Sequence, residues 1–347
     1  MSLLNHTIMS PEDLVFLSFC IPTYNRSLRV HELVTSILSC PDTDIEVVVL
    51  DNGSTDDTLA RLSTIQDSRL HVHINGTNRG ALFNMVNVLE KGLGNYLIYS
   101  TDQDCMEPKG IPAFKAFLKT HTGVTCGYCS FEDRDSNHQI VSRGYECVST
   151  IAYKGRHPTG YFFGRSALKK IRLVERFSDF DVVDLFPLEF AFAEIGLAGD
   201  GAIFHGHLFT PNTGSDVVTH KSSTTVGTSS KAFFAPVARL KLAVSYSAHI
   251  DSLSLPESQK SSLIAQVFIR ELVASTLGYR AVMGNDKLCI HYGMTSRKVT
   301  QWEILRTGAW FLRSYLARRY AGRPARVPAF LRDVLSLLGQ KVAARIA

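Results

Sequence analysis

Short apolar runs alternate with segments of helical spacing over the first part of this chain of 347 residues. Each run is rich in β-branched or aromatic side chains, which is typical of a buried strand. The predicted strands cover residues 15–21, 45–50, 70–74 and 96–99. The predicted intervening helices cover residues 30–38, 54–65 and 81–91. Ser54 and Asp57 have the spacing of a capping box, so we expect them to begin the second helix.

Strands that alternate with helices in this way form right-handed βαβ units, which predicts an α/β fold around a mostly parallel sheet. Ligands of such sheets bind beyond the carboxyl ends of the strands. Polar clusters directly follow three of the predicted strands. They are Pro22-Thr23-Tyr24-Asn25, Asp51-Asn52-Gly53 and Thr101-Asp102-Gln103-Asp104. We expect these clusters to share one edge of the sheet.

The pattern changes in the second half of the chain. Residues 124–131 and 139–148 are predicted strands, and Asp184–Ile195 is a predicted helix entered through Pro187. Helical spacing then continues to the end, near residues 232–250, 257–278, 301–320 and 327–346. We therefore expect an N-terminal arm (1–14), an α/β domain (15–230) and a C-terminal helical domain with basic amphipathic helices (231–347).

Two carboxylates, Asp102 and Asp104, stand one residue apart at the end of the fourth predicted strand. A pair of this kind suits a hard divalent cation such as Mn²⁺ or Mg²⁺, shared with the oxygens of a diphosphate. The cation offsets the charge of a departing nucleoside diphosphate. A DxD sequence in a surface loop carries little information, but its place at a strand end favours a metal site.

Four segments together resemble the glycosyltransferases of family 2, which have the GT-A fold and an inverting mechanism. They are FLSFCIPTYNR (16–26), VVVLDNGSTDDT (47–58), NRGALFN (78–84) and YLIYSTDQD (96–104). The resemblance is dense over residues 15–110 and looser to about residue 210. It implies transfer of a sugar from a nucleotide-sugar donor, UDP- or dTDP-linked, to a saccharide or lipid-linked acceptor in bacterial surface polysaccharide synthesis.

The resemblance also implies which residues bind the donor. Pro22, Tyr24 and Asp51 would hold the nucleotide base, since a carboxylate accepts the ring N–H of a uracil-like base. Gly53 would let the turn pass close to the ligand, and the Arg79 guanidinium suits phosphate. The full expected donor set is Pro22, Thr23, Tyr24, Asn25, Asp51, Asn52, Gly53, Arg79 and Asp102.

The resemblance leaves alternatives for the metal ligands and for the general base. The family often shows DxDD, whereas Cys105 follows Asp104 here and Pro108 comes one residue early, which leaves open which carboxylate binds the metal. A late histidine can add a metal ligand, and His205 and His207 are the candidates, ahead of His220. The general base is expected to be Asp184, about a dozen residues before Gly196, with Asp181 and Glu189 as alternatives.

The C-terminal tail is strongly basic. Residues 297–347 hold eleven Lys/Arg and two acids, a net +9 in a chain of net +5. An apolar stripe on the first tail helix is formed by Trp302, Leu305, Ala309, Leu312 and Leu316. Apolar stripes flanked by arginine suit an anionic membrane. The alternative is a helical domain that packs on the catalytic domain or forms a homo-oligomer.

Several function classes fit poorly. No run of eighteen apolar residues predicts a membrane span, no signal peptide is evident, and seven scattered cysteines suit a reducing compartment. We therefore expect a cytoplasmic protein, peripheral at the inner face of the plasma membrane. Nucleic-acid binding would leave the acidic strand ends unexplained. A catalytically inactive nucleotide-sugar-binding relative and a nucleotidyltransferase on a similar fold remain as alternatives.

Overall fold

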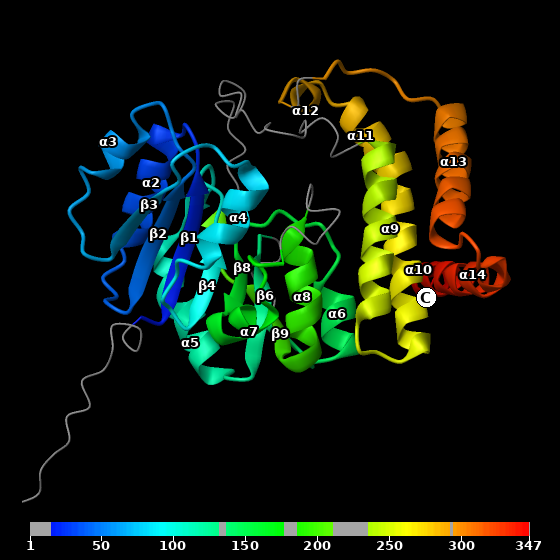
Figure 1. Ribbon diagram of the computed structural model, residues 1–347, viewed down its shortest axis with the longest axis horizontal. Helices are drawn as coiled ribbons and strands as arrows, with labels where there is room; N and C mark the ends of the chain where they lie inside the picture. The colour runs from blue at the N-terminus through cyan, green and yellow to red at the C-terminus, as the bar shows by residue number, and fades with distance from the viewer. Residues whose placement is uncertain (1–14, 132–136, 177–185, 211–234, 292–293, 347) are drawn as a thin grey trace, which may run out of the picture. The chain divides into compact units, whose positions relative to one another are not determined.

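The computed structural model describes residues 15–131, 137–176, 186–210, 235–291 and 294–346 (Figure 1). The chain divides into two compact units. Unit 1 comprises Met1–Asp179 and Ala191–Val217, and unit 2 comprises Phe180–Phe190 and Val218–Ala347. The boundary predicted between residues 230 and 231 lies outside the described residues, as does the N-terminal arm.

Unit 1 is built on an eight-stranded sheet of order β3-β2-β1-β4-β8-β6-β9-β7. Its first four strands are parallel: β1 (Leu17–Thr23), β2 (Ile45–Asp51), β3 (Leu70–Ile74) and β4 (Tyr96–Tyr99). These are the four strands predicted from the apolar runs. Because β1 and β2 are almost wholly buried, their β-branched and aromatic side chains pack on both faces of the sheet.

Helices connect these strands as predicted, namely α2 (Ser27–Leu38), α3 (Thr58–Leu62) and α4 (Ala81–Leu89). The expected capping box is wrong, since the residue before α3 is Asp57 and its side chain makes no cap hydrogen bond. Ser54 instead donates its hydroxyl proton to the Asp51 carboxylate. The short α3 therefore begins four residues later than its sequence predicts.

The remaining strands of this sheet do not all run the same way. Strand β8 (Tyr161–Gly164) is antiparallel to β4 and to β6 (Val124–Ser130), while β9 (Asp200–His205) is parallel to β6. The predicted strand 139–148 is only partly correct, because β7 (Gln139–Val141) stops and α6 (Tyr145–Ile151) begins after Gly144. Gly144 has a φ of 89°, which turns the chain out of the strand.

Shorter elements complete unit 1. They are β5 (Cys105–Met106) paired with β10 (Phe209–Thr210), η1 (Pro108–Gly110), α5 (Ile111–Thr120), α7 (Arg165–Ile171) and α8 (Pro187–Ala198), which begins in unit 2. Phe114 of α5 packs edge-on against Phe162 and Phe204, with ring centroids 5.2 and 4.9 Å away. This aromatic contact joins helix and sheet in one core. Cys126 and Cys129 lie buried in β6 as part of the core.

Unit 2 is helical, as predicted. Its elements are α9 (Pro236–Ser252), α10 (Glu257–Val273), the π-helical η5 (Ala274–Gly278), α11 (Tyr279–Met283), α12 (Asp286–His291), α13 (Gln301–Arg319), η6 (Pro324–Arg326) and α14 (Val327–Ile346). Its core joins Phe268 of α10 to Phe311 and Tyr315 of α13 and to Phe330 of α14. No helix in the described part of the chain combines the length and apolar character that crossing a bilayer requires.

Candidate functional site

The three predicted polar clusters lie at the ends of adjacent strands. Thr23 at the end of β1 pairs in register with Asp51 at the end of β2, and the Asn52 amide donates to the Thr23 carbonyl at 2.9 Å. On the other side of β1, β4 continues into Ser100, whose amide donates to the Cys20 carbonyl at 3.0 Å. The topology therefore brings residues that are far apart in sequence to one edge, which we call the carboxyl edge.

A tight turn after β2 organises the Asp51 carboxylate. Asp51 is fully buried, and its Oδ2 accepts from the amides of Gly53 at 3.1 Å and Ser54 at 2.9 Å. Ser54 Oγ also accepts from the Asn25 amide at 2.8 Å, which ties this turn to the turn after β1. Gly53 has a φ of 76°, and a Cβ there would lie 3.0 Å from the Thr77 carbonyl carbon. Glycine is therefore required.

A network of asparagines holds the loop that carries Arg79. Asn52 Nδ2 donates to Asn78 Oδ1 at 2.9 Å, and Asn52 Oδ1 accepts from the Arg79 amide and from Asn75 Nδ2, both at 3.0 Å. The Arg79 guanidinium lies 3.6 Å from the centre of the Phe83 ring. Asn52 is 2% exposed. Asn52 therefore positions the loop that carries Arg79. Its place in the donor set stays a prediction.

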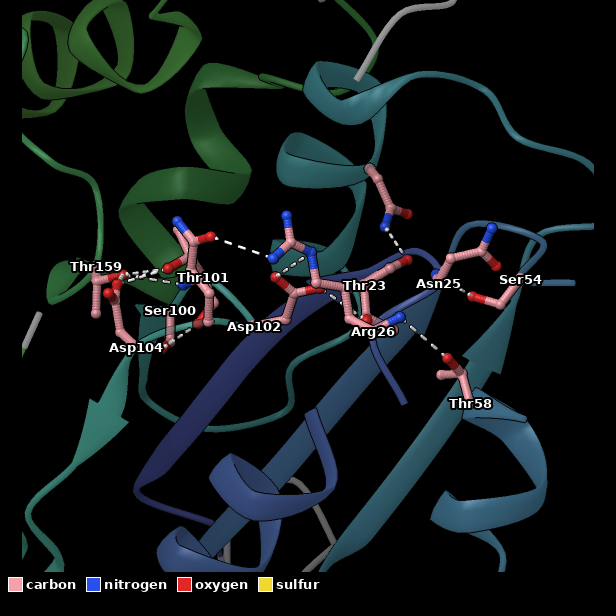
Figure 2. A network of polar contacts seen from close by, with 12 residues as sticks. Thr23, Asn25, Arg26, Ser54, Thr58, Ser100, Thr101, Asp102, Asp104 and Thr159 are labelled. Atoms are coloured by element: carbon pink, nitrogen blue, oxygen red, sulfur yellow. Dashed lines mark hydrogen bonds and ion pairs between the residues drawn. The ribbon is translucent and has the colours of Figure 1, made fainter. Parts of the chain in front are cut away.

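Asp102 lies at the centre of the edge, as Figure 2 shows. Its Oδ2 accepts from Thr23 Oγ1 at 2.8 Å, and its Oδ1 lies 3.8 Å from Arg26 Nε. Burial raises the pKa of Asp102 above its ordinary value, and the nearby Asp104 charge adds to the increase. Arg26, Thr23 and the Tyr24 amide oppose that shift without cancelling it. A cation bound here would relieve the same unfavourable burial of charge.

Asp104 has different surroundings. Its side chain is 3% exposed, and Oδ2 contacts Thr101 Oγ1 at 2.5 Å and the Thr159 hydroxyl (Figure 2). Oδ2 also lies 2.6 Å from His157 Nε2. Burial tends to raise the pKa of Asp104, but the hydrogen bond and charge of His157, with the two threonine hydroxyls, hold it below its ordinary value. Asp104 is thus kept as a charged carboxylate.

His157 and Thr159 are the partners that the sequence did not single out. Thr159 stands at the start of segment 159–165, which leads into α7. The structure places a turn followed by β8 there. The Gly160 amide donates to the Tyr99 carbonyl at 2.8 Å, which holds Thr159 beside the end of β4. A lone histidine before Pro158 gives no pattern by which its pairing with Asp104 could have been found.

The residues at the carboxyl edge can be compared with the ligands that the expected metal needs. Within the described ranges, no group of three or more His, Cys, Asp or Glu side chains is arranged to hold a metal ion. Mg²⁺-type sites often use only one or two carboxylates, with substrate phosphates and water as the other ligands. Asp102, 13% exposed at its side chain, fits that arrangement, with Asp104 as the second carboxylate. The residues therefore fit a cation that binds together with a diphosphate.

Residues 18–179 match the sequence model of glycosyl transferase family 2. This part of the chain belongs to glycosyl transferase family 2. All of the edge residues described above fall within it. The match ends before the general-base candidates and before the histidines, so family 2 membership does not extend to those assignments.

Among relatives, the chain is 28% identical over 130 residues to a chondroitin synthase of Pasteurella multocida, which covers 37% of this chain and 13% of that protein. It is 30% identical over 171 residues to the GalNAc(5)-diNAcBac-PP-undecaprenol beta-1,3-glucosyltransferase of Campylobacter jejuni, which covers 46% of this chain and 55% of that protein. The chain thus spans about an eighth of the length of the first relative and little more than half of the second.

Among solved structures, S. aureus TarS 1-349 in complex with UDP-GlcNAc has a TM-score of 0.53 and 15% identity, and the match covers 88% of this chain and 93% of TarS 1-349. That likeness concerns the fold. With the mostly parallel sheet, it confirms the predicted GT-A fold with a C-terminal helical part.

The remaining predicted base and metal residues are only partly described. Asp181, Asp184 and His220 lie outside the described residues. Glu189 lies in the first turn of α8 and is 1% exposed. Strand β9 ends at His205, so His207 lies beyond the strand.

The two late histidines have separate surroundings. The His205 amide donates to His138 Nδ1 at 3.2 Å, and His205 Nδ1 is buried with no hydrogen-bond partner in the described structure. His207 is exposed, and its carbonyl packs so closely against Gly110 that a Cβ there would clash. Neither belongs to a metal-capable cluster of the described residues. Their role as metal ligands remains a prediction.

Proposed function

We propose that this protein is an inverting glycosyltransferase that moves a sugar from a nucleotide-sugar donor to a saccharide or lipid-linked acceptor. The proposal depends mainly on one observation: Asp51 and Asp102 both lie at the carboxyl edge, and Thr23 connects them. Thr23 Oγ1 donates to Asp102, and Thr23 is the register partner of Asp51. Acidic groups grouped at the switch region of such a sheet suit a nucleotide and its cation.

In this proposal the turn after β2 receives the base. Asp51, already held by two amides, accepts the ring N–H of uracil, and Pro22 and Tyr24 line the opposite side. Asn25 fixes the turn through Ser54 and Thr55, to whose amide its Oδ1 is 2.7 Å. The Arg79 guanidinium faces the diphosphate, to which a planar cation binds well.

Asp102 and Asp104 would hold Mn²⁺ or Mg²⁺ against the diphosphate. The bound cation supplies charge compensation for the leaving nucleoside diphosphate. The His157 and threonine contacts keep Asp104 ionised, so that no proton must leave before the cation binds. Thr23 and Arg26 orient Asp102 for the same purpose.

The transfer step needs a base. A carboxylate removes the acceptor hydroxyl proton as that oxygen attacks the anomeric carbon, and the bond from that carbon to the diphosphate oxygen breaks. We propose Asp184 as this base, with Asp181 and Glu189 as alternatives. Replacing each in turn by its amide should identify it, because only the base variant would lose turnover while still binding donor.

We further propose that the acceptor belongs to bacterial surface polysaccharide synthesis, as the names of the relatives suggest. A lipid-linked acceptor would require the protein to work at the inner face of the plasma membrane. The basic segment 297–347 supports association with an anionic membrane. A nucleic-acid ligand is not proposed, and a homo-oligomer is compatible with the same chain.

A panel of nucleotide sugars tests the proposal. We expect one UDP- or dTDP-sugar to raise the melting temperature in the presence of Mn²⁺, with UDP-GlcNAc tested first because TarS was crystallised with it. The Asp51→Asn variant should lose that increase and keep the melting temperature of the free protein within a few degrees. If no nucleotide sugar protects the wild type, with Mn²⁺ or Mg²⁺, the proposal is wrong. Protection without turnover on any saccharide acceptor would favour the inactive relative.

A further inference from the structure

Large apolar side chains are unevenly exposed in the described structure. Fourteen are strongly exposed, and ten of them belong to unit 2. Isolated exposed leucines are normal, whereas a group of them marks an interaction surface. Six of the ten fall between residues 273 and 305: Val273, Leu277, Leu288, Ile290, Trp302 and Leu305. We call this group the end patch.

The fold of unit 2 brings these side chains to one end of its helices. Figure 1 shows α10 ending, α12 lying, and α13 beginning at the same end of the unit. Beneath them, Met283, Cys289 and Val299 form a small buried cluster with Ile304 packed on it. Gly308 of α13 lies against Thr276 of η5, since a Cβ there would be 3.8 Å from the Thr276 methyl group. The elements that carry the end patch are therefore packed together.

The structure of α13 explains why its two side chains in the end patch face solvent. Phe311 and Tyr315 are fully buried and form its inner face, so Trp302 (67% exposed) and Leu305 (64% exposed) face solvent. The start of the helix is fixed by a complete capping box between Thr300 and Glu303. Exposure here is thus a property of an ordered helix.

The charge around the end patch is positive. Residues 273–306 contain five Lys/Arg and two acids, a net +3. One acid, Glu303, is already paired with Arg297 at 2.8 Å. Lys287, Lys298 and Arg306 are exposed beside the apolar groups. Aromatic and aliphatic side chains surrounded by lysine and arginine fit the interface of an anionic bilayer better than a neutral protein surface.

We propose that the end patch inserts into the interfacial layer of an anionic membrane, with Trp302 and Leu305 as its central anchors. This deepens the membrane association in the proposed function and does not require that the donor site be active. It also assigns the membrane contact to one end of unit 2, in place of the arginine-flanked stripes along the whole tail. Binding then depends on apolar burial and on charge together, and weakens at high salt.

The chain contains two tryptophans, Trp302 and Trp310, which makes fluorescence a direct test. In the Trp310→Phe variant we expect the Trp302 emission to shift to the blue on adding phosphatidylglycerol-containing vesicles, and not with pure phosphatidylcholine. In the matched Trp302→Phe variant, Trp310 halfway along α13 should shift much less. Equal shifts in both variants, or none in either, would overturn the proposal.

A second pair of variants separates the end patch from the rest of the tail. Leu305→Gln should weaken sedimentation with the anionic vesicles about tenfold, from the lost burial of one leucine. Leu335→Gln, at 67% exposure on α14, is the matched control and should leave it unchanged. Equal losses would contradict the location, and a Trp302 shift driven by protein concentration alone would show that a second copy covers the patch. UDP binding by the same samples reports on the donor site independently.

Discussion

The carboxyl edge of unit 1 buries charged side chains, whereas the end patch of unit 2 exposes apolar ones. At the edge, Asp51 and Asp104 are buried and hydrogen-bonded by neighbouring turns. At the end patch, Trp302 and Leu305 are exposed on a well-capped helix. Burying a carboxylate costs free energy unless it is paired, and exposing a leucine costs free energy unless something covers it.

The comparison teaches where to look for ligands. Each region keeps an arrangement that folding alone would not favour, which suggests that a ligand compensates for it. The compensating groups differ: a cation and a nucleotide for the edge, an apolar phase bearing negative charge for the patch. Mutations that remove the unfavourable feature should therefore lose function more than stability in both places.

The largest effect is expected from the edge carboxylates. Asp104→Ala and the isosteric Asp104→Asn should each lower turnover about a thousandfold, since charge compensation of the leaving group supplies several kcal/mol. Circular dichroism should show that both variants remain folded. Asp57→Asn, at a carboxylate 53% exposed in the same unit, is the control and should retain wild-type rates. Wild-type turnover in either Asp104 variant would refute the assignment of the edge.

The next effect separates stability from function in unit 2. Phe268→Ala removes a buried ring that contacts Phe311, Tyr315 and Phe330, and should lower the free energy of unfolding by about 3–5 kcal/mol. Urea unfolding followed by fluorescence measures it. Leu335→Ala, at an exposed site on the same unit, should cost no more than about 0.5 kcal/mol. Similar losses in the two variants would mean that Phe268 is not part of the core.

Much of unit 1 could be predicted from the sequence because its strands are buried on both faces. Apolar runs of β-branched residues then locate β1, β2 and β4 to within about two residues, and the polar residue after each run locates the edge. Thr23, Asp51 and Asp102 were found in this way. What the runs cannot give is which side chains the edge residues contact.

The capping boxes show why local patterns were insufficient. Ser54 and Asp57 matched the motif but form no box, because the Ser54 hydroxyl is taken by Asp51. Thr300 and Glu303 have the same spacing and form the complete box. Competing partners decide between the two, and those come from tertiary structure. For the same reason His157, remote in sequence from Asp104, carried no recognisable pattern.

A smaller effect tests the helix that carries the end patch. Thr300→Ala removes the hydroxyl that accepts from the Glu303 amide at 3.2 Å, and should cost about 1 kcal/mol of unfolding free energy. It should also weaken vesicle binding slightly, since Trp302 lies in the first turn that frays. Thr295→Ala in the preceding loop is the control. If both variants unfold at the same urea concentration as wild type, the capping box does not stabilise α13.

The smallest effect concerns an ion pair that belongs to neither region. Lys115 bridges Asp42, at 2.6 Å, and Asp44, and although burial opposes it, the lysine holds the pKa of Asp44 below its ordinary 3.8. A depressed native pKa means that the pair stabilises the protein above the unfolded value and loses this contribution as pH falls through the native value. Asp44→Asn should therefore cost about 0.5 kcal/mol at neutral pH, because Lys115 keeps Asp42 as a partner.

That small cost should disappear on acidification below the native pKa of Asp44, where wild type and variant carry the same charge at this position. Unfolding free energies measured at neutral and acid pH, at low salt, give the comparison, and added salt should reduce the difference at neutral pH. A difference that persists unchanged in acid would mean that Asp44 contributes through packing or neutral hydrogen bonds. Because neither the carboxyl edge nor the end patch involves this pair, UDP binding and vesicle binding of Asp44→Asn should both equal wild type, which sets the baseline against which loss of function in those two regions is judged.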